Sequence, residues 1–273
     1  MSKKMAKKTP KKTMGLKLTQ DIIFKIFFSR NEQVLMSLLR SFLPIPDNIS
    51  DVIILNPEAK DKDDQTPASK PTDALDCEPH AILPEKSDEK QVILDLRVRL
   101  SSGENINVEM QSVFSKYLQE RILFYWTRLY SQGLKRGKDY DQVAPAYSLI
   151  FTTYSMLEKK FKGSINSFSI RSDEYPHDRL NKNLRIVTAE LNKLPSDYKQ
   201  LIDLREKWCY LLSHSEAITE AEYHYLSKDE ELKMALEHLN RLSEDERLEQ
   251  VALSRDLSEM TQYLHEKGLR EEG

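Results

Sequence analysis

The fold is decided by two short segments, VILDLRVRL at residues 92–100 and ENINVEMQ at residues 104–111, which Ser101-Ser102-Gly103 joins. Both segments alternate apolar and polar side chains with the two-residue period of a half-buried β-strand. The short glycine-containing connection predicts an antiparallel hairpin. With Ser102 at the centre of the turn, Arg97 lies opposite Asn107, and Asp95 lies opposite Glu109.

The predicted pairing brings two carboxylates together. Directly opposed residues on one face of a hairpin have Cβ atoms roughly 4.5–5.5 Å apart. Carboxylates that close repel each other unless a cation lies between them, so Asp95 and Glu109 suggest a divalent metal site. The alternative is a solvated strand face on which Arg97 and Arg99 neutralise the two acids as ordinary surface pairs. The hairpin alone favours this alternative, because solvated faces are much commoner than metal sites.

Composition and charge limit the classes of function. The chain has 273 residues, 31% of them charged, and a net charge of −3 that is unevenly distributed. Residues 1–17 contain seven lysines and no acid, whereas residues 216–273 contain sixteen acids and seven bases. Two distant cysteines suggest neither a disulfide framework nor a zinc cluster, and no apolar run approaches the ~20 residues of a membrane span. The expectation is a cytoplasmic protein that spans no membrane.

The order of predicted elements indicates the architecture. Lysine repulsion predicts a basic disordered tail over residues 1–17, and the polar, proline-containing segment 59–89 predicts a flexible insertion. The order through Tyr154 is α-β-β-β-α-β, which predicts an α/β fold with a mixed sheet flanked by helices. Apolar periodicity places helices at 19–40, at 114–135 and in several segments from 197 onward, and strands at 51–55, 145–154, 166–171 and 184–190.

Several short motifs follow one another in an order that resembles a known family. They are Asp21-Ile-Ile-Phe24-Lys25, Ile54-Leu55-Asn56-Pro57-Glu58, Ile93-Leu94-Asp95, Val108-Glu109-Met110-Gln111-Ser112, Arg121, Tyr125-Trp126-Thr127-Arg128-Leu129-Tyr130, Gly137-Lys138-Asp139-Tyr140 and Glu190-Leu191. This succession resembles the PD-(D/E)XK nuclease superfamily, and within it the recombination-promoting nucleases and related transposases.

The resemblance implies a restriction-endonuclease-like core and three regions of the chain. The superfamily core is also α-β-β-β-α-β, in agreement with the order read from periodicity. The expected regions are the basic tail at 1–17, a nuclease-like domain at 18–210 that contains the 59–89 insertion, and an acidic helical region at 211–273. The apolar residues of this last region need a cover, which either a partner or the chain's own core would provide.

The same resemblance assigns roles at the hairpin. It implies that Asp95 and Glu109 bind Mg²⁺ or Mn²⁺ and that the backbone carbonyl of Met110 completes the protein's share of the ligands. Magnesium prefers oxygen ligands and usually keeps several waters, so one or two carboxylates suffice. Such an ion neutralises phosphate charge and acidifies an attacking water.

Gln111 stands where the superfamily's usual motif has lysine. Glutamine orients water through hydrogen bonds but brings no positive charge. Lys25 or Arg121 would supply that charge, and Asp21 would be an additional acid near the metal. For Lys25 and Arg121 the alternatives are a solvated helix face and a surface ion pair, and Asp21 would otherwise only favour the positive end of its helix.

Positive charge also recurs along the predicted helix at 114–135. Arg121, Arg128 and Lys135 are seven residues apart and fall on one helical stripe that would grip DNA phosphates. An amphipathic helix shows the same spacing on an ordinary solvated face. The lysine-rich tail is a further candidate for nonspecific DNA affinity.

The resulting hypothesis is a metal-dependent DNA endonuclease associated with recombination or transposition. The competing hypothesis is a nuclease-fold module with little activity that acts in DNA binding or protein interaction. The expected partner is DNA, and a homodimer is plausible because cutting a duplex needs two active sites or two events. The sequence contains no glycine-rich phosphate loop or dinucleotide fingerprint, so no nucleotide cofactor is expected.

Overall fold

The computed structural model describes residues 15–49, 51–55, 96–134, 137, 139–248 and 250–254. The first fourteen residues of the expected basic tail and the expected insertion at 59–89 lie outside the described residues. Two predicted site residues, Asp95 and Lys135, also lie outside them.

The N-terminal helical segment is two helices, α1 (Asp21–Ser29) and α2 (Glu32–Phe42). The single helix predicted over residues 19–40 is therefore wrong. Asn31 adopts an extended conformation at φ −148° and ψ 95°, and its side chain accepts a hydrogen bond from Val34 N at 3.1 Å. An asparagine side chain competes with the helix for backbone donors and so begins a new helix here.

The predicted hairpin forms, and it lies within a six-stranded mixed sheet of order β1-β2-β3-β4-β6-β5. Arg97 lies opposite Asn107, as the turn predicts, and Gly103 occupies the turn with a φ of 105°. The described ladder between β2 and β3 ends at Leu96 opposite Val108. The strands are β1 (Val52–Ile54), β2 (Leu96–Leu100), β3 (Asn105–Gln111), β4 (Ala146–Thr152), β5 (Ile165–Phe168) and β6 (Leu184–Glu190).

A helical crossover connection makes the two neighbouring central strands β3 and β4 parallel. Helix α3 (Leu118–Ser131) connects β3 to β4, which run parallel, and β4 also runs parallel to β6. The pairs β1–β2, β2–β3 and β5–β6 are antiparallel. With the first helix divided in two, the order through β4 is the predicted α-β-β-β-α-β.

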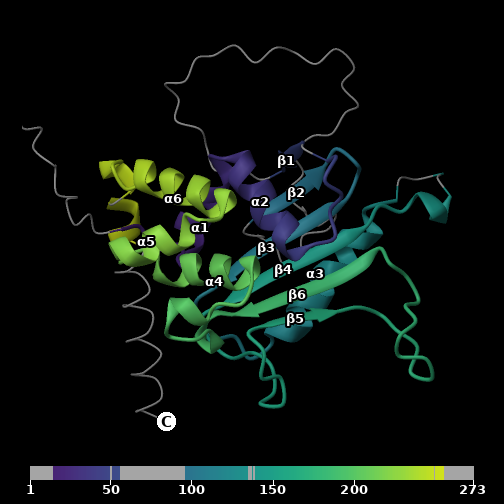
Figure 1. Ribbon diagram of the computed structural model, residues 1–273. Coiled ribbons are helices and arrows are strands. Elements are labelled where there is room, and N and C mark those ends of the chain that lie inside the picture. Colours follow the sequence, from purple (N-terminus) through teal and green to yellow (C-terminus); the bar gives the residue numbers. More distant parts are fainter. Residues whose placement is uncertain are drawn as a thin grey trace, which may run out of the picture.

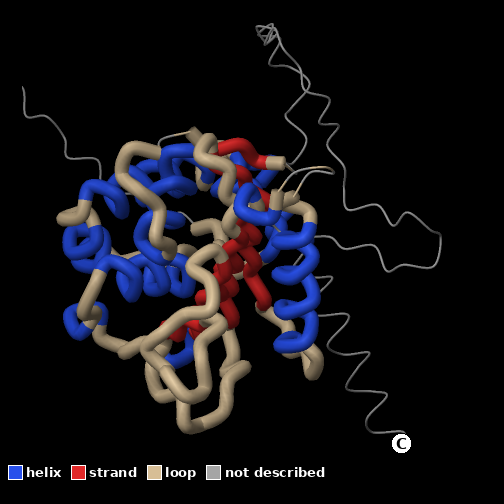
Figure 2. The backbone as a smooth tube through the Cα atoms, turned by 90° about the vertical axis from the view of Figure 1, so that its right-hand side faces the viewer, coloured by secondary structure: helices blue, strands red, loops and turns tan. Residues whose placement is uncertain are grey.

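Helices cover the two faces of the sheet unequally (Figures 1 and 2). Among the described helices only α3 lies on one face, where its buried residues Leu118, Ile122 and Trp126 form one hydrophobic cluster with Ala146 and Ile150 of β4. The other face is covered by α1, α2 and the three C-terminal helices, α4 (Leu204–His214), α5 (Glu220–Leu226) and α6 (Glu230–Leu242). The described part of the protein therefore has three layers, with the sheet between a layer of several helices and a layer formed by α3.

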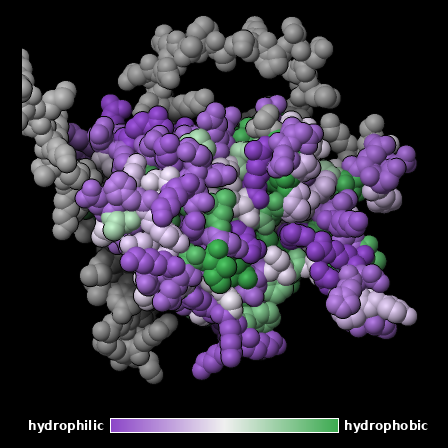
Figure 3. All heavy atoms as spheres, in the orientation of Figure 1, coloured by the Kyte–Doolittle hydropathy of each residue, from purple (hydrophilic) through white to green (hydrophobic). Residues whose placement is uncertain are grey.

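The C-terminal helices belong to the larger hydrophobic core. Leu226, Leu232, Leu236 and Leu239 are buried in the same cluster as Phe24, so the chain's own core covers these apolar residues. The expected division between residues 210 and 211 falls inside α4. The face that carries these helices is mainly hydrophilic in Figure 3, as expected for helices whose apolar stripes point inward.

None of the helices in the described part of the chain is long and apolar enough to cross a lipid bilayer.

Replacing Leu236 with alanine is expected to destabilise the whole protein by about 2–5 kcal/mol, because the side chain is 2% exposed and its removal leaves a cavity. The exposed Leu253 is the control, and its replacement by alanine should change stability by less than about 0.5 kcal/mol. Urea denaturation is followed by far-ultraviolet circular dichroism and by fluorescence of Trp126 and Trp208, which lie on opposite sides of the sheet. Two separate transitions would contradict a single shared core.

Candidate active site

Strand β3 presents Asn107, Glu109 and Gln111 to the face of the sheet that α3 covers. The alternation of the strand turns Val108 and Met110 to the opposite face, where both are buried in the larger core. Glu109 pairs in register with Ile150, which contacts α3, and only 3% of Glu109 is exposed. The polar face of this strand is thus covered by a helix at Glu109 and is not an ordinary solvated surface.

Three neighbours surround the Glu109 carboxylate. Asn107 Nδ2 donates to Glu109 Oε1 at 2.7 Å, and Gln111 Nε2 lies 3.4 Å from Glu109 Oε2. From α3, Arg121 Nη2 lies 3.9 Å from Glu109 Oε2 and donates to Gln111 Oε1 at 2.5 Å. One carboxylate, two amides and one guanidinium therefore converge between β3 and α3.

Burial raises the pKa of Glu109, because desolvation penalises the charged carboxylate. The hydrogen bond from Asn107 and the charge of Arg121 act in the opposite direction but have the smaller effect. Asn107 and Arg121 therefore do not fully offset the free-energy cost of burying the charged Glu109 carboxylate. Such a perturbed carboxyl beside convergent polar groups is typical of functional sites.

The polar atoms around Glu109 are suited to a hard cation. The described buried atoms that have no hydrogen-bond partner include Asn107 Oδ1. An orphaned amide oxygen beside a buried carboxylate provides the oxygen chemistry that Mg²⁺ and Mn²⁺ prefer. In the described part of the chain no three His, Cys, Asp or Glu side chains converge, so Glu109 would need Asp95 or other ligands to complete such a site.

The structure brings some of the predicted site residues together. Glu109, Gln111 and Arg121 are in contact, and the side chain of Met110 lies in the core on the other face, which leaves only its backbone for the site. Arg128 lies two helical turns beyond Arg121 and is partly buried, while Asp95 and Lys135 are outside the described residues.

Asp21 and Lys25 lie on α1, one helical turn apart, and both are partly buried. Helix α1 covers the face of the sheet opposite to the one that bears the Glu109 side chain. Asp21 Oδ1 accepts from Ile22 N at 2.7 Å, a local bond at the start of the helix. The roles of Asp21 and Lys25 beside the metal remain predictions.

Two polar groups near the site were not assigned a role from the sequence. The first is Asn107, which donates a hydrogen bond to the carboxylate of Glu109. The sequence could have indicated this contact, because Asn107 lies two residues before Glu109 and therefore on the same face of the strand. The second is Glu190, the last residue of β6, which is 0% exposed. The sequence could have indicated a role for Glu190, because it is a charged residue at the end of a largely apolar strand. Carboxylates that are fully buried in this way are rare unless they are paired.

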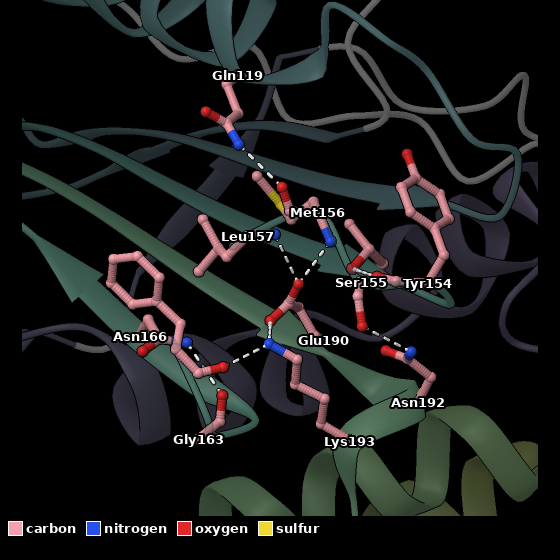
Figure 4. A network of polar contacts seen from close by, with 12 residues as sticks. Gln119, Tyr154, Ser155, Met156, Leu157, Gly163, Asn166, Glu190, Asn192 and Lys193 are labelled. Carbon is pink, nitrogen blue, oxygen red and sulfur yellow. Dashed lines mark hydrogen bonds and ion pairs between the residues drawn. The ribbon is translucent and has the colours of Figure 1, made fainter. Parts of the chain in front are cut away.

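Glu190 is the centre of the network in Figure 4. Its Oε1 accepts from the backbone amides of Met156 at 2.5 Å and Leu157 at 2.9 Å, and its carboxylate pairs with Lys193. Gln119 Nε2 of α3 donates to the carbonyl of Met156 at 2.8 Å. The network therefore fastens the segment after β4 to both β6 and the first turn of α3.

The same segment is joined to the end of β3. Thr153 N donates to the Gln111 carbonyl at 3.2 Å, and Thr153 Oγ1 donates to the Ser112 carbonyl at 3.1 Å. In register, Thr152 of β4 lies between Gln111 of β3 and Glu190 of β6. Glu190 thus helps to fix the backbone beside the candidate site from two strands away.

The mixed sheet, its helical layers and the α-β-β-β-α-β order define a restriction-endonuclease-like α/β fold. The chain belongs to the PD-(D/E)XK nuclease family transposases, whose family model matches residues 68–264, more than two thirds of its length. No curated protein and no solved structure matches it. The family match begins after α1, so the element around Asp21 and Lys25 lies outside the matched range.

Proposed function

We propose that this chain is a metal-dependent DNA endonuclease that acts in recombination or transposition and cuts at the site between β3 and α3. The family supports a nuclease-type hydrolase whose substrate is DNA. The observation that carries the proposal is the buried carboxylate of Glu109, held by Asn107 and Gln111 and faced by Arg121. A surface ion pair would not explain a carboxylate that is almost completely buried and whose pKa is raised.

We assign the metal ligands to Glu109, to Asp95 and to the Met110 carbonyl. Asp95 precedes Leu96, and Leu96 pairs with Val108, so continuation of an antiparallel ladder by one step would place Asp95 opposite Glu109. Mg²⁺ or Mn²⁺ held there would neutralise charge on the phosphate and acidify the attacking water.

The other side chains orient the reactants in this proposal. Gln111 Oε1 is held by Arg121, so its amide nitrogen points its protons toward Glu109 and away from the guanidinium. This arrangement lets the amide position a water by hydrogen bonding. Arg121 contributes the positive charge that a lysine at position 111 would otherwise bring. In this role its guanidinium points toward Glu109.

The proposal is tested by cleavage of supercoiled plasmid in Mg²⁺, Mn²⁺ or EDTA by the wild type and by Asp95→Ala. We expect nicking or linearisation that requires the metal and is lost in the variant. The melting temperature of the wild type should also rise with either metal, since a ligand that binds the native state stabilises it.

A folded wild type that binds DNA but neither cuts it nor gains stability from metal would overturn the proposal. That result would favour the second candidate function, an inactive nuclease-fold module that acts in DNA binding or protein interaction. The specific observation in its favour is Gln111, where the superfamily's usual motif has a lysine that stabilises hydroxide.

A further inference from the structure

Exposed aromatic side chains follow the candidate site directly along the chain. Phe114 is 68% exposed, Tyr117 is 64% exposed and Phe124 is 55% exposed, and Leu123 beside them is also exposed. Single apolar residues at a surface are ordinary, but a group of large ones is a candidate interaction surface, and these four lie within eleven residues of the chain. We name Phe114, Tyr117 and Phe124 the α3 aromatic surface.

The α3 aromatic surface and the candidate site share one connection. Phe114 comes three residues after Gln111, and Tyr117 is the N-cap of α3. Phe124 lies two helical turns beyond Tyr117 on the same stripe, and Arg121 between them contacts Gln111. Helix α3 stands alone on its side of the sheet in Figure 2, with no other described element over its outer face.

Part of this surface is held in place before any ligand arrives. The ring of Phe114 packs edge-to-face against Tyr154, with centroids 5.4 Å apart. Tyr154 belongs to the segment after β4, in which Glu190 accepts hydrogen bonds from the backbone amides of Met156 and Leu157 (Figure 4). A pre-positioned aromatic ring loses little conformational entropy when it binds a flat ligand.

The charges around the rings identify the kind of ligand. Lys116 Nζ lies 5.4 Å from the centroid of the Tyr117 ring. Between residues 112 and 128 there are three cations and one acid, the exposed Glu120. The cores of protein–protein interfaces are depleted in lysine, whereas aromatic rings combined with cations bind single-stranded nucleic acid.

We propose that the α3 aromatic surface stacks unpaired bases of the DNA strand whose phosphate lies at Glu109, so that this chain prefers DNA with single-stranded character. The inference rests on the proposed function, because it places the substrate strand at the same site. Duplex DNA keeps its bases stacked inside the helix, so the rings would add affinity only where the strand is unpaired.

The test measures the affinity of labelled oligothymidylate of about 15 nucleotides, and of a duplex of equal length, by fluorescence anisotropy in EDTA. Phe114→Ala and Tyr117→Ala are each expected to weaken binding of the single strand about tenfold and of the duplex far less. The dependence of affinity on salt should stay unchanged, because no phosphate contact is removed. Phe114→Tyr should bind as the wild type does.

The matched control is Tyr140→Ala. Tyr140 is 87% exposed but precedes β4, whereas Tyr154 follows it, so this control removes an aromatic ring at the other end of that strand. Its affinity for the single strand should equal that of the wild type. Unchanged single-strand affinity in both alanine variants, or equal losses for single strand and duplex, would overturn the inference. Loss of self-association in these variants with unchanged single-strand affinity would instead assign the surface to a second copy of the chain.

Plasmid cleavage by the same preparations separates this inference from the proposed function. If the wild type cuts plasmid while both alanine variants bind the single strand normally, only the stacking surface is wrong. If the wild type does not cut but the variants lose single-strand affinity, the result supports the stacking surface and contradicts the proposed nuclease function.

Discussion

Replacing Glu109 with glutamine is expected to reduce DNA cleavage by on the order of 10²–10³-fold while the protein melts at a temperature at least as high as the wild type. Glutamine keeps an oxygen that accepts from Asn107 but loses the charge that would bind a metal. Burial disfavours the ionised Glu109, which is why its pKa is raised, so removing the charge relieves a cost to folding near neutral pH. The attraction to Arg121 that is lost acts over 3.9 Å and is weaker.

Plasmid cleavage and thermal melting are measured on the same preparation of Glu109→Gln. Metal should raise the melting temperature of the wild type but not of the variant. The control is Glu120→Gln, which removes an exposed carboxylate of α3 without touching the buried site and should cut normally. Wild-type cleavage by Glu109→Gln would exclude this carboxylate from the chemistry, and a failure to fold would make its role structural.

Replacing Glu190 with alanine is expected to destabilise the protein by about 3–5 kcal/mol, a large fraction of the total stability of a domain. The change leaves Lys193, only 17% exposed, without its carboxylate partner. It also removes the acceptor of the Met156 and Leu157 amides. The free energy of unfolding from urea denaturation measures the loss.

A double-mutant cycle distinguishes the charge pair from the backbone hydrogen bonds. In Glu190→Gln/Lys193→Met both charges are absent but an oxygen still faces the two amides, so about half of the lost stability should return. The exposed pair of Lys233 and Glu230, at 3.3 Å, provides the control, and Lys233→Met should cost less than about 0.5 kcal/mol. If Glu190→Ala cost no more than this control, the buried network would not stabilise the fold.

The architecture could be predicted from the sequence because its signals are local. The hairpin register follows from the alternation and from one turn, and the observed pairing of Arg97 with Asn107 confirms it. Strand β6 also begins and ends where the apolar pattern predicts. The N-terminal helix could not be predicted correctly, because the apolar period continues through Asn31 and only its side-chain bond to Val34 interrupts the helix.

The candidate site could be predicted only in part. The alternation of β3 places Glu109 and Gln111 on one face, but it does not reveal whether that face meets water or a helix. That outcome depends on how α3 packs, which also brings Arg121 into contact with Gln111. The DNA contact expected of Arg121 stays a prediction. Glu190 lies 81 residues after Glu109 in the chain, so only the sheet order makes it a neighbour of the site.

The packing of the first helix against the last described long helix also bears on how the protein is made. His238 of α6 lies 2.9 Å from the carbonyl of Phe27 in α1, and the backbone amide of Leu18 donates to Ser215 Oγ at 2.8 Å. After α1 has been synthesised, the ribosome must therefore add about two hundred more residues before Ser215 and His238 are both present. The strand and helix of the candidate site emerge long before that point, but the core that supports them closes only afterwards. Any DNA-cutting activity would accordingly start only after α6 has been synthesised.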